Sequence, residues 1–354
     1  MNFELFENRG LFDRHIEHFY SMALKCSLLL LTLWLGTIPL TAQTPNDEVD
    51  VVRVNTDVTN LPFTVLDKQR RFITTLNVDD IRVLEDGVPQ QLFTFQRETD
   101  RPLAIAFLID VSQSQQYTLS NEKAAARGFI ESAIHSNKDQ IAVIPFTGEA
   151  FLEAGLTRDV LGIYKVLQQI DVAVPAYQGA GRPLSGIPTG PGLPATPEEG
   201  TTAIWDAIAL TSSQVLGKTQ DQRRRAIILL TDGLDTSSRL KRSNAINEVL
   251  AAEAVVYAIG IGDSKGEGVN KGAVREIAER TGGRAFFPKK IDDLQSAFAE
   301  IEKELRTQYL IAYSSSNKKR DGAYRKITVE IANPALKNEK LEVRHRPGYF
   351  AKKG

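Results

Sequence analysis

The spacing of apolar and polar positions divides the chain into three stretches with different periods. Between 51 and 96 apolar and polar residues alternate, as in "VVRVNTDVTNLPFTVLD", which predicts strands with one buried face. From 103 to 305 short apolar runs alternate with amphipathic helical stretches. After 307 the pattern is β-like again, in "QYLIAYS", "YRKITVEI" and "KLEVRHRPGYF".

The middle stretch predicts an α/β fold: a doubly wound, mostly parallel sheet with helices on both faces. Its expected strands, "LAIAFLID", "QIAVIPF", "RAIILLTD" and "VVYAIGIG", are continuously apolar, as strands are when both faces of the sheet are covered. The expected helices lie near 121–135, 158–170, 202–216, 239–253, 272–280 and 291–305.

The N-terminal pattern is that of an export signal. Lys25 precedes an apolar run over 28–40, which ends at the small residues Thr41 and Ala42. The long mixed-charge segment before it suggests that the true start is Met22. We expect an exported protein, periplasmic or secreted; if the signal is not cleaved, residues 26–42 would instead anchor the protein in the membrane.

We therefore expect a signal peptide over 1–43, a β-rich segment over 44–100, an α/β domain over 101–306 and a second β-rich segment over 307–354. The two β-rich flanks could be separate modules, or could pair into one small sandwich into which the α/β domain is inserted. The second arrangement is favoured, because the chain ends of a domain usually lie close together.

The composition mainly excludes certain kinds of binding site. The chain is 42% hydrophobic and 25% charged, with a net charge of -1, which gives no electrostatic footprint for nucleic acid or for an anionic membrane surface. Its one cysteine, Cys26, lies in the expected signal, and its four histidines are scattered, so no zinc spacing exists. One Pro- and Gly-rich stretch, 172–200, is long enough to be a functional loop.

The residues that could bind a ligand lie at the ends of two expected strands and at the start of one expected helix. Asp110 ends "AIAFLID" and is followed by Ser112 and Ser114; Thr202 begins a helix after the 172–200 loop; Asp232 ends "RAIILLTD". In doubly wound sheets ligands bind at the carboxyl ends of the strands. All five groups offer oxygen, which selects a hard divalent cation such as Mg²⁺, with Mn²⁺ or Ca²⁺ as alternatives.

The segments "DVSQS", "TTAIWDA" and "LLTDG" resemble, in order and separation, the three parts of the metal-ion-dependent adhesion site of von Willebrand factor type A domains. The resemblance covers roughly 101–305, and the flanks resemble those of exported bacterial proteins of the same type. It implies that Mg²⁺ is coordinated by Asp110, Ser112, Ser114, Thr202 and Asp232.

Two departures from the family pattern leave the ligand set intact. Gln113 stands between the serines where glycine is common, and "GTT" makes Thr201 an alternative to Thr202. Thr202 is favoured because "AIWDA" follows it in register. Asp206, close to these motifs, is expected to lie on the helix surface or to cap a helix; Asp235 is expected to form a turn, and Trp205 is expected to be packed.

The leading functional hypothesis is an exported, non-enzymatic adhesion module whose Mg²⁺ captures an acidic side chain of a protein partner. A structural component of a cell-envelope assembly, with a metal that only stabilises the fold, is the second hypothesis. The third is a metal-assisted hydrolase or phosphotransferase with Asp110 as nucleophile. It is disfavoured because Ser112 stands where a second acid or base is needed, and no Ser–His–Asp set can be assembled.

Overall fold

The computed structural model describes residues 58–97, 101–134, 138–173, 176–187, 201–219, 223–262 and 268–353. The chain divides into two compact units, Met1–Asn55 and Thr56–Gly354, and all described residues belong to the second. The expected signal peptide, 1–43, and most of the Pro/Gly-rich stretch lie outside the described residues. Among the helices that are described, none is both long and apolar enough to cross a membrane.

The middle of the chain forms the expected mostly parallel sheet, in the order β12-β11-β10-β5-β6-β7-β9, with β8 paired to β6. Strands β12, β11, β10, β5 and β6 run parallel, and β7, β8 and β9 add antiparallel pairs at one edge. The strands are β5 (Leu103–Asp110), β6 (Gln140–Phe146), β7 (Ala150–Leu152), β8 (Ala154–Thr157), β9 (Arg182–Leu184), β10 (Arg224–Thr231), β11 (Ala254–Gly260) and β12 (Ala285–Phe286).

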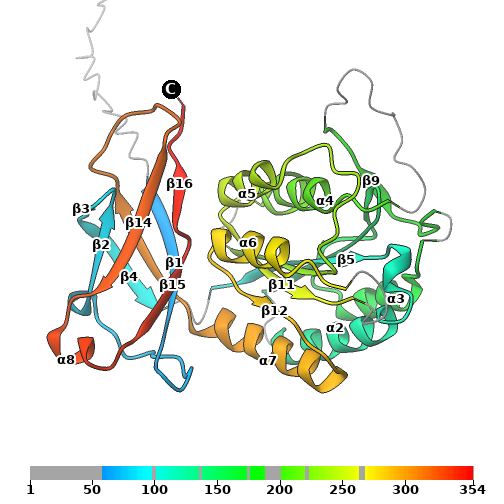
Figure 1. Cartoon of the computed structure of the whole chain (residues 1–354), viewed down its shortest axis with the longest axis horizontal. Helices are drawn as coiled ribbons and strands as arrows, with labels where there is room; N and C mark the ends of the chain where they lie inside the picture. The colour runs from blue at the N-terminus through cyan, green and yellow to red at the C-terminus, as the bar shows by residue number, and fades with distance from the viewer. Residues whose placement is uncertain are drawn as a thin grey trace, which may run out of the picture. The chain divides into compact units, whose positions relative to one another are not determined.

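Helices cover both faces of this sheet, which confirms the predicted fold class (Figure 1). One face carries α2 (Leu119–Ala133), α3 (Val160–Gln169) and α7 (Ile291–Thr307). The other carries α4 (Ile204–Leu210), the π-helical turn η3 (Thr211–Leu216), α5 (Arg242–Ala251) and α6 (Lys271–Thr281).

Strand β5 shows why the strands are continuously apolar. Ala104, Ala106 and Leu108 belong to the core under α4, α5 and α6, while Ile105 and Phe107 belong to the core under α2, α3 and α7. Successive side chains of a strand point to opposite faces, so a strand between two helical layers needs an apolar residue at every position.

The β-rich flanks form two further sheets, in the orders β15-β1-β13-β4 and β16-β14-β2-β3. The strands are β1 (Val58–Leu66), β2 (Ile81–Glu85), β3 (Val88–Pro89), β4 (Leu92–Arg97), β13 (Tyr309–Ser314), β14 (Tyr324–Ile331), β15 (Glu342–His345) and β16 (Gly348–Phe350). Their inner faces share one core, which includes Leu61, Phe63, Val83, Tyr313 and Ile327. Each sheet contains strands from both flanks: β1 pairs with β13, and β2 pairs with β14.

The stretch "DIRVLEDGVPQQLFTFQRE" forms three strands that are divided between the two sheets. The turn at Asp86 and Gly87, both with positive φ, joins β2 to the short strand β3. The chain then leaves this sheet, and β4 pairs with β13 in the other one.

Candidate metal centre

Two strand ends bring the predicted ligands together at the carboxyl edge of the parallel sheet. Asp110 is the last residue of β5, and Asp232 follows β10, which is the hydrogen-bonded neighbour of β5. Ser112 and Ser114 lie in the turn after β5, where the 3-10 turn η2 (Gln113–Gln115) carries the chain towards α2.

Hydrogen bonds link four of the five predicted residues. The backbone N–H of Ser112 donates to Oδ1 of Asp110 at 3.0 Å. The hydroxyls of Ser112 and Ser114 are 3.0 Å apart, and the hydroxyl of Ser114 donates to Oδ2 of Asp232 at 2.7 Å. The loops after β5 and β10 are therefore joined by side chains that all carry oxygen.

The backbone of Thr202 is hydrogen-bonded to the loop that follows β10. Its N–H donates to the hydroxyl of Thr236 at 2.7 Å, and its carbonyl accepts from the N–H groups of Thr236 and Ser237. Thr202 is buried, whereas Thr201, the alternative, is half-buried and uses its carbonyl to accept from Thr147.

Three acidic or aromatic neighbours have supporting roles. The Asp235 carboxylate accepts from the N–H of Ile204 at 2.8 Å and so holds the start of α4. The Asp206 carboxylate, buried rather than on the helix surface, accepts from the N–H groups of Arg239 and Leu240. Trp205 is packed, as expected, at 7% exposure.

Glycines shape the loop after β10. Gly233 has φ +78°, and a Cβ built there would lie 2.6 Å from Cγ2 of Val274, so a side chain at this position would meet α6. A Cβ on Gly262, which follows β11, would lie 3.2 Å from Cβ of Asp232. Gly233 therefore lets the loop pass close to α6 with positive φ, and Gly262 lets the chain after β11 pass close to Asp232.

Three further residues contribute to the site without having been predicted. The hydroxyl of Thr231 donates to Oδ2 of Asp110 at 2.7 Å and fixes that carboxylate from β10. The fully buried amide of Gln115 donates to the hydroxyl of Ser114 and to the carbonyl of Ile261. Glu122, in the first turn of α2, is fully buried, and neither of its carboxylate oxygens makes a hydrogen bond of ordinary geometry among the described residues.

The electrostatics of the site favour a bound cation. Burial raises the pKa of Asp110 to about 6, and the charge of Asp232 adds to this shift. Burial likewise raises the pKa of Glu122 to about 8, with contributions from the charges of Asp110 and Asp232. A divalent cation between these carboxylates would remove the repulsion that drives part of the shifts.

The donor set fits a hard divalent ion. In the described part of the chain no three carboxylate, imidazole or thiol groups lie close enough to hold a metal by themselves. An ion here would therefore need the serine and threonine hydroxyls as well as Asp110 and Asp232, an all-oxygen set that suits Mg²⁺ better than zinc.

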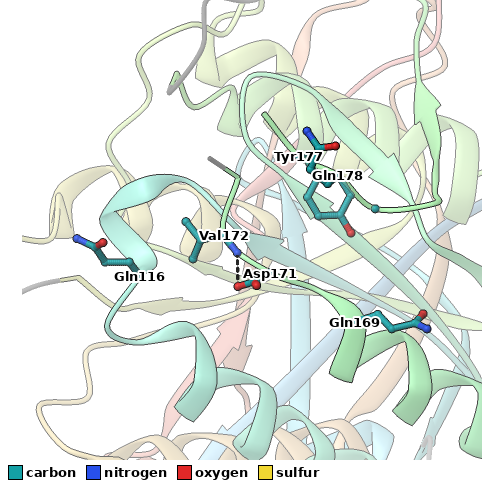
Figure 2. Close-up of a pocket in the computed structure, with 7 residues that line it drawn as sticks. Gln116, Gln169, Asp171, Val172, Tyr177 and Gln178 are labelled. Atoms are coloured by element: carbon teal, nitrogen blue, oxygen red, sulfur yellow. Dashed lines mark hydrogen bonds between the residues drawn. The ribbon is translucent and has the colours of Figure 1, made fainter. Parts of the chain in front are cut away.

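A pocket of about 530 Å³ opens beside the loop that carries Ser112 and Ser114 (Figure 2). Gln116, two residues beyond Ser114, lines it, and the N–H of Ala173, the residue after the lining residue Val172, donates to the carbonyl of Val111. The other lining residues are Gln169, Asp171, Val172, Tyr177, Gln178 and Gly179. Figure 2 shows the Asp171 carboxylate among them, bonded to the N–H of Val172.

The family model of the von Willebrand factor type A domain matches residues 194–300, a range that contains Thr202 and Asp232 but begins after Asp110. A search of curated protein sequences finds no match.

Solved structures with a similar fold include three from different organisms. Proximal thread matrix protein 1 from the mussel byssus, solved with a zinc-occupied metal-ion-dependent adhesion site, is 18% identical over 62% of this chain, with a TM-score of 0.46. An aerotolerance-related membrane protein from Bacteroides fragilis is 18% identical over 57% of this chain and 99% of its own, with a TM-score of 0.42. A von Willebrand factor type A protein from Catenulispora acidiphila is 12% identical over 85% of this chain and 75% of its own, with a TM-score of 0.45.

This chain spans half the length of the mussel protein. The sequence motifs, the doubly wound sheet and the family-model match agree on the nature of the middle stretch. The chain therefore contains a von Willebrand factor type A domain.

Proposed function

We propose that this protein is a non-enzymatic binding module that uses a divalent cation, Mg²⁺ in the first instance, to capture an acidic side chain of a protein partner. The ion would be held by Asp110, Ser112, Ser114, Thr202 and Asp232. The observation that carries the proposal is the 2.7 Å bond between Ser114 and Asp232, which joins two neighbouring strand ends through oxygen atoms that Mg²⁺ prefers.

The charge of the donor set supports an acidic ligand. Two carboxylates balance the two positive charges of the ion, and the hydroxyls coordinate without adding charge. When bound, the ion would supply an electrophilic position for a carboxylate from outside. Ser114 is exposed, so that position would be accessible from solvent.

The surface around the site offers further contacts for a partner. Tyr117, three residues beyond Ser114, is 70% exposed, and exposed aromatic residues often dominate binding energy once an interface covers them. The pocket with Asp171 and Tyr177 lies beside the same loop. We include both in the proposed partner surface.

We propose further that the protein is exported, to the periplasm or beyond the cell, because of the signal pattern before Thr44. A structural role in a cell-envelope assembly would use the same metal site for stability alone. The two roles differ in whether removal of the metal releases an acidic partner.

The test has two steps. Calorimetric titration of Mg²⁺ and Mn²⁺ into metal-stripped protein should give saturable binding, which Asp110→Asn and Asp232→Asn should abolish. Glu131→Gln, on the exposed face of α2, is the matched control and should bind as the wild type does.

The second step uses an array of peptides with a central Asp or Glu, each beside its Asn or Gln counterpart. Binding that needs Mg²⁺, is reversed by EDTA and is lost in the amide counterparts would support carboxylate capture. Metal binding with thermal stabilisation, but with equal binding of acid and amide peptides, would favour the structural role. No metal binding by the wild type would contradict the proposal.

A further inference from the structure

Glu122 is an unusual carboxylate for the start of a helix. It lies in the first turn of α2, its side chain is fully buried, and its oxygens make no hydrogen bond of ordinary geometry among the described residues, although the Thr118 side chain is close enough to lower its pKa. A buried carboxyl without such a bond is unfavourable when charged, or its pKa shifts, so proteins seldom retain one without compensation.

A chain of hydrogen bonds joins the start of α2 to the candidate metal loop. Helical side chains lean towards the N-terminus of their helix, and α2 begins five residues after Ser114. One turn before Glu122, the hydroxyl of Thr118 donates to Oε1 of Gln115 at 2.9 Å. The amide of Gln115 in turn donates to the hydroxyl of Ser114.

Electrostatic coupling supports the same placement. Burial is the largest cause of the raised pKa of Glu122; the Thr118 side chain opposes it as a hydrogen-bond donor, and the charges of Asp110 and Asp232 add to it. The three carboxylates are nevertheless too far apart to ligate one ion together. Glu122 therefore lies within electrostatic range of the site and outside the set of direct ligands.

We propose that Glu122 is a third carboxylate of the metal centre, which stabilises the cation from outside its ligand shell. This inference rests on the proposed metal site. With the ion bound, its two positive charges cancel the repulsion that Asp110 and Asp232 exert on the negative charge of Glu122, and the cost of burying that charge is reduced. Groups one layer behind the ligands typically change metal affinity about 10–100-fold when they are removed.

The substitution Glu122→Gln tests this, because the amide keeps the size of the side chain and removes its charge. Calorimetry at pH 8 should show Mg²⁺ affinity lowered about 10–100-fold, while the thermal midpoint of the metal-free protein is not lower than that of the wild type, because the buried charge has been removed. Glu131→Gln, on the exposed face of the same helix, should change neither quantity.

A comparison of ions of different charge distinguishes this role from a purely structural one. An outer carboxylate stabilises a trivalent ion more than a divalent one, so Glu122→Gln should lower the affinity for La³⁺ by a larger factor than the affinity for Mg²⁺. Loss of packing would lower both by the same factor. The comparison holds even if the variant is less stable, because both ions are titrated into the same protein.

The outcomes are distinct. Weaker Mg²⁺ binding with a still larger loss for La³⁺ supports the inference. Unchanged affinities, or equal losses for the two ions, overturn it and leave the proposed function standing. A wild-type protein that binds neither ion overturns both.

Discussion

At the scale of single residues, the candidate site depends on groups that the ligand motif does not include. Thr231 precedes the motif aspartate and fixes Asp110 from the neighbouring strand, and Gln115 links Ser114 to the end of β11. Both are visible in the sequence, but only the pairing of β5 with β10 explains why Thr231 reaches Asp110. The ligand motif alone therefore does not show which neighbouring side chains hold Asp110 and Ser114 in place.

Replacement of Thr231 by valine should test this orientation. The change removes the donor to Oδ2 of Asp110 at nearly constant volume, and an unsatisfied buried partner costs about 1–3 kcal/mol. We expect a lower thermal midpoint and weaker Mg²⁺ binding, measured by circular dichroism and calorimetry. Thr231→Ser, which keeps the hydroxyl, should retain most of the metal affinity; equal losses in both variants would contradict the explanation.

The pKa of Glu122 predicts a pH dependence of stability in the metal-free protein. In the unfolded chain this carboxyl titrates near 4.5, whereas burial raises its pKa to about 8 in the folded protein. Between these values the folded state binds more protons, so the free energy of unfolding falls as pH rises. Asp110, whose pKa is about 6, contributes in the same direction.

Thermal midpoints of EDTA-treated protein, measured from pH 5 to 9, should therefore decrease with pH, and Glu122→Gln should flatten the decrease. The contribution of Asp110 remains in both proteins and serves as an internal reference. Parallel curves for the wild type and the variant would show that Glu122 does not titrate with a raised pKa.

At the scale of elements, the turn after β10 is the most constrained part of the site. Gly233 has positive φ and faces Val274 of α6, so the loop with Asp232 fits only without a side chain there. Gly233→Ala should destabilise the protein by about 1–3 kcal/mol and weaken metal binding, since strained backbone shifts Asp232. Gly87→Ala, in the β2–β3 turn, also has positive φ but no neighbour within 4 Å, and should leave the metal affinity unchanged.

Much of the element pattern could be predicted because its cause is local. Apolar runs between amphipathic stretches specify strands covered on both faces, so the alternation over 103–305 predicted the doubly wound sheet, which is confirmed. The ligand set stays a prediction, although Asp110, Ser112, Ser114 and Asp232 do lie together. Glu122 could not be predicted, because "SNEK" reads as an exposed helix start and its burial depends on packing against distant elements.

The division of "DIRVLEDGVPQQLFTFQRE" between two sheets could not be predicted from the local sequence pattern either. The pattern specifies extended chain and a turn at Asp86 and Gly87, but not which partner each strand finds. That choice depends on β13 and β14, more than 200 residues further along the chain.

At the scale of the whole molecule, the residues that form the core of the sandwich lie on both sides, in sequence, of those that form the cores of the α/β domain. The two cores of the α/β domain draw only on residues between Leu103 and Leu305, and the core of the paired sheets draws on residues before and after them. The domain is thus inserted into a sandwich made from both flanks. Each part has an apolar core of its own.

We therefore expect residues 101–307, produced alone, to fold and to keep the Mg²⁺ affinity of the longer protein. Circular dichroism should show a cooperative thermal transition, and calorimetry should give a dissociation constant within about threefold, less than 1 kcal/mol. A fragment that folds but has lost metal binding would mean that the flanks influence the site. A fragment that does not fold would contradict the inference that the α/β domain folds independently of the sandwich.

The insertion also has a mechanical consequence. The chain leaves the sandwich at the end of β4 and returns at the start of β13, and these are neighbours in one sheet, with Arg97 opposite Tyr309. Tension applied through a captured partner would reach the sandwich through two covalent connections that lie side by side, and through side-chain contacts such as that of Asn60 with Glu253. Because β4 and β13 would be pulled from the same end and in the same direction, the load would act along both strands together and would not separate one from the other. Their pairing would therefore not be the point at which tension from the inserted domain opens the sandwich.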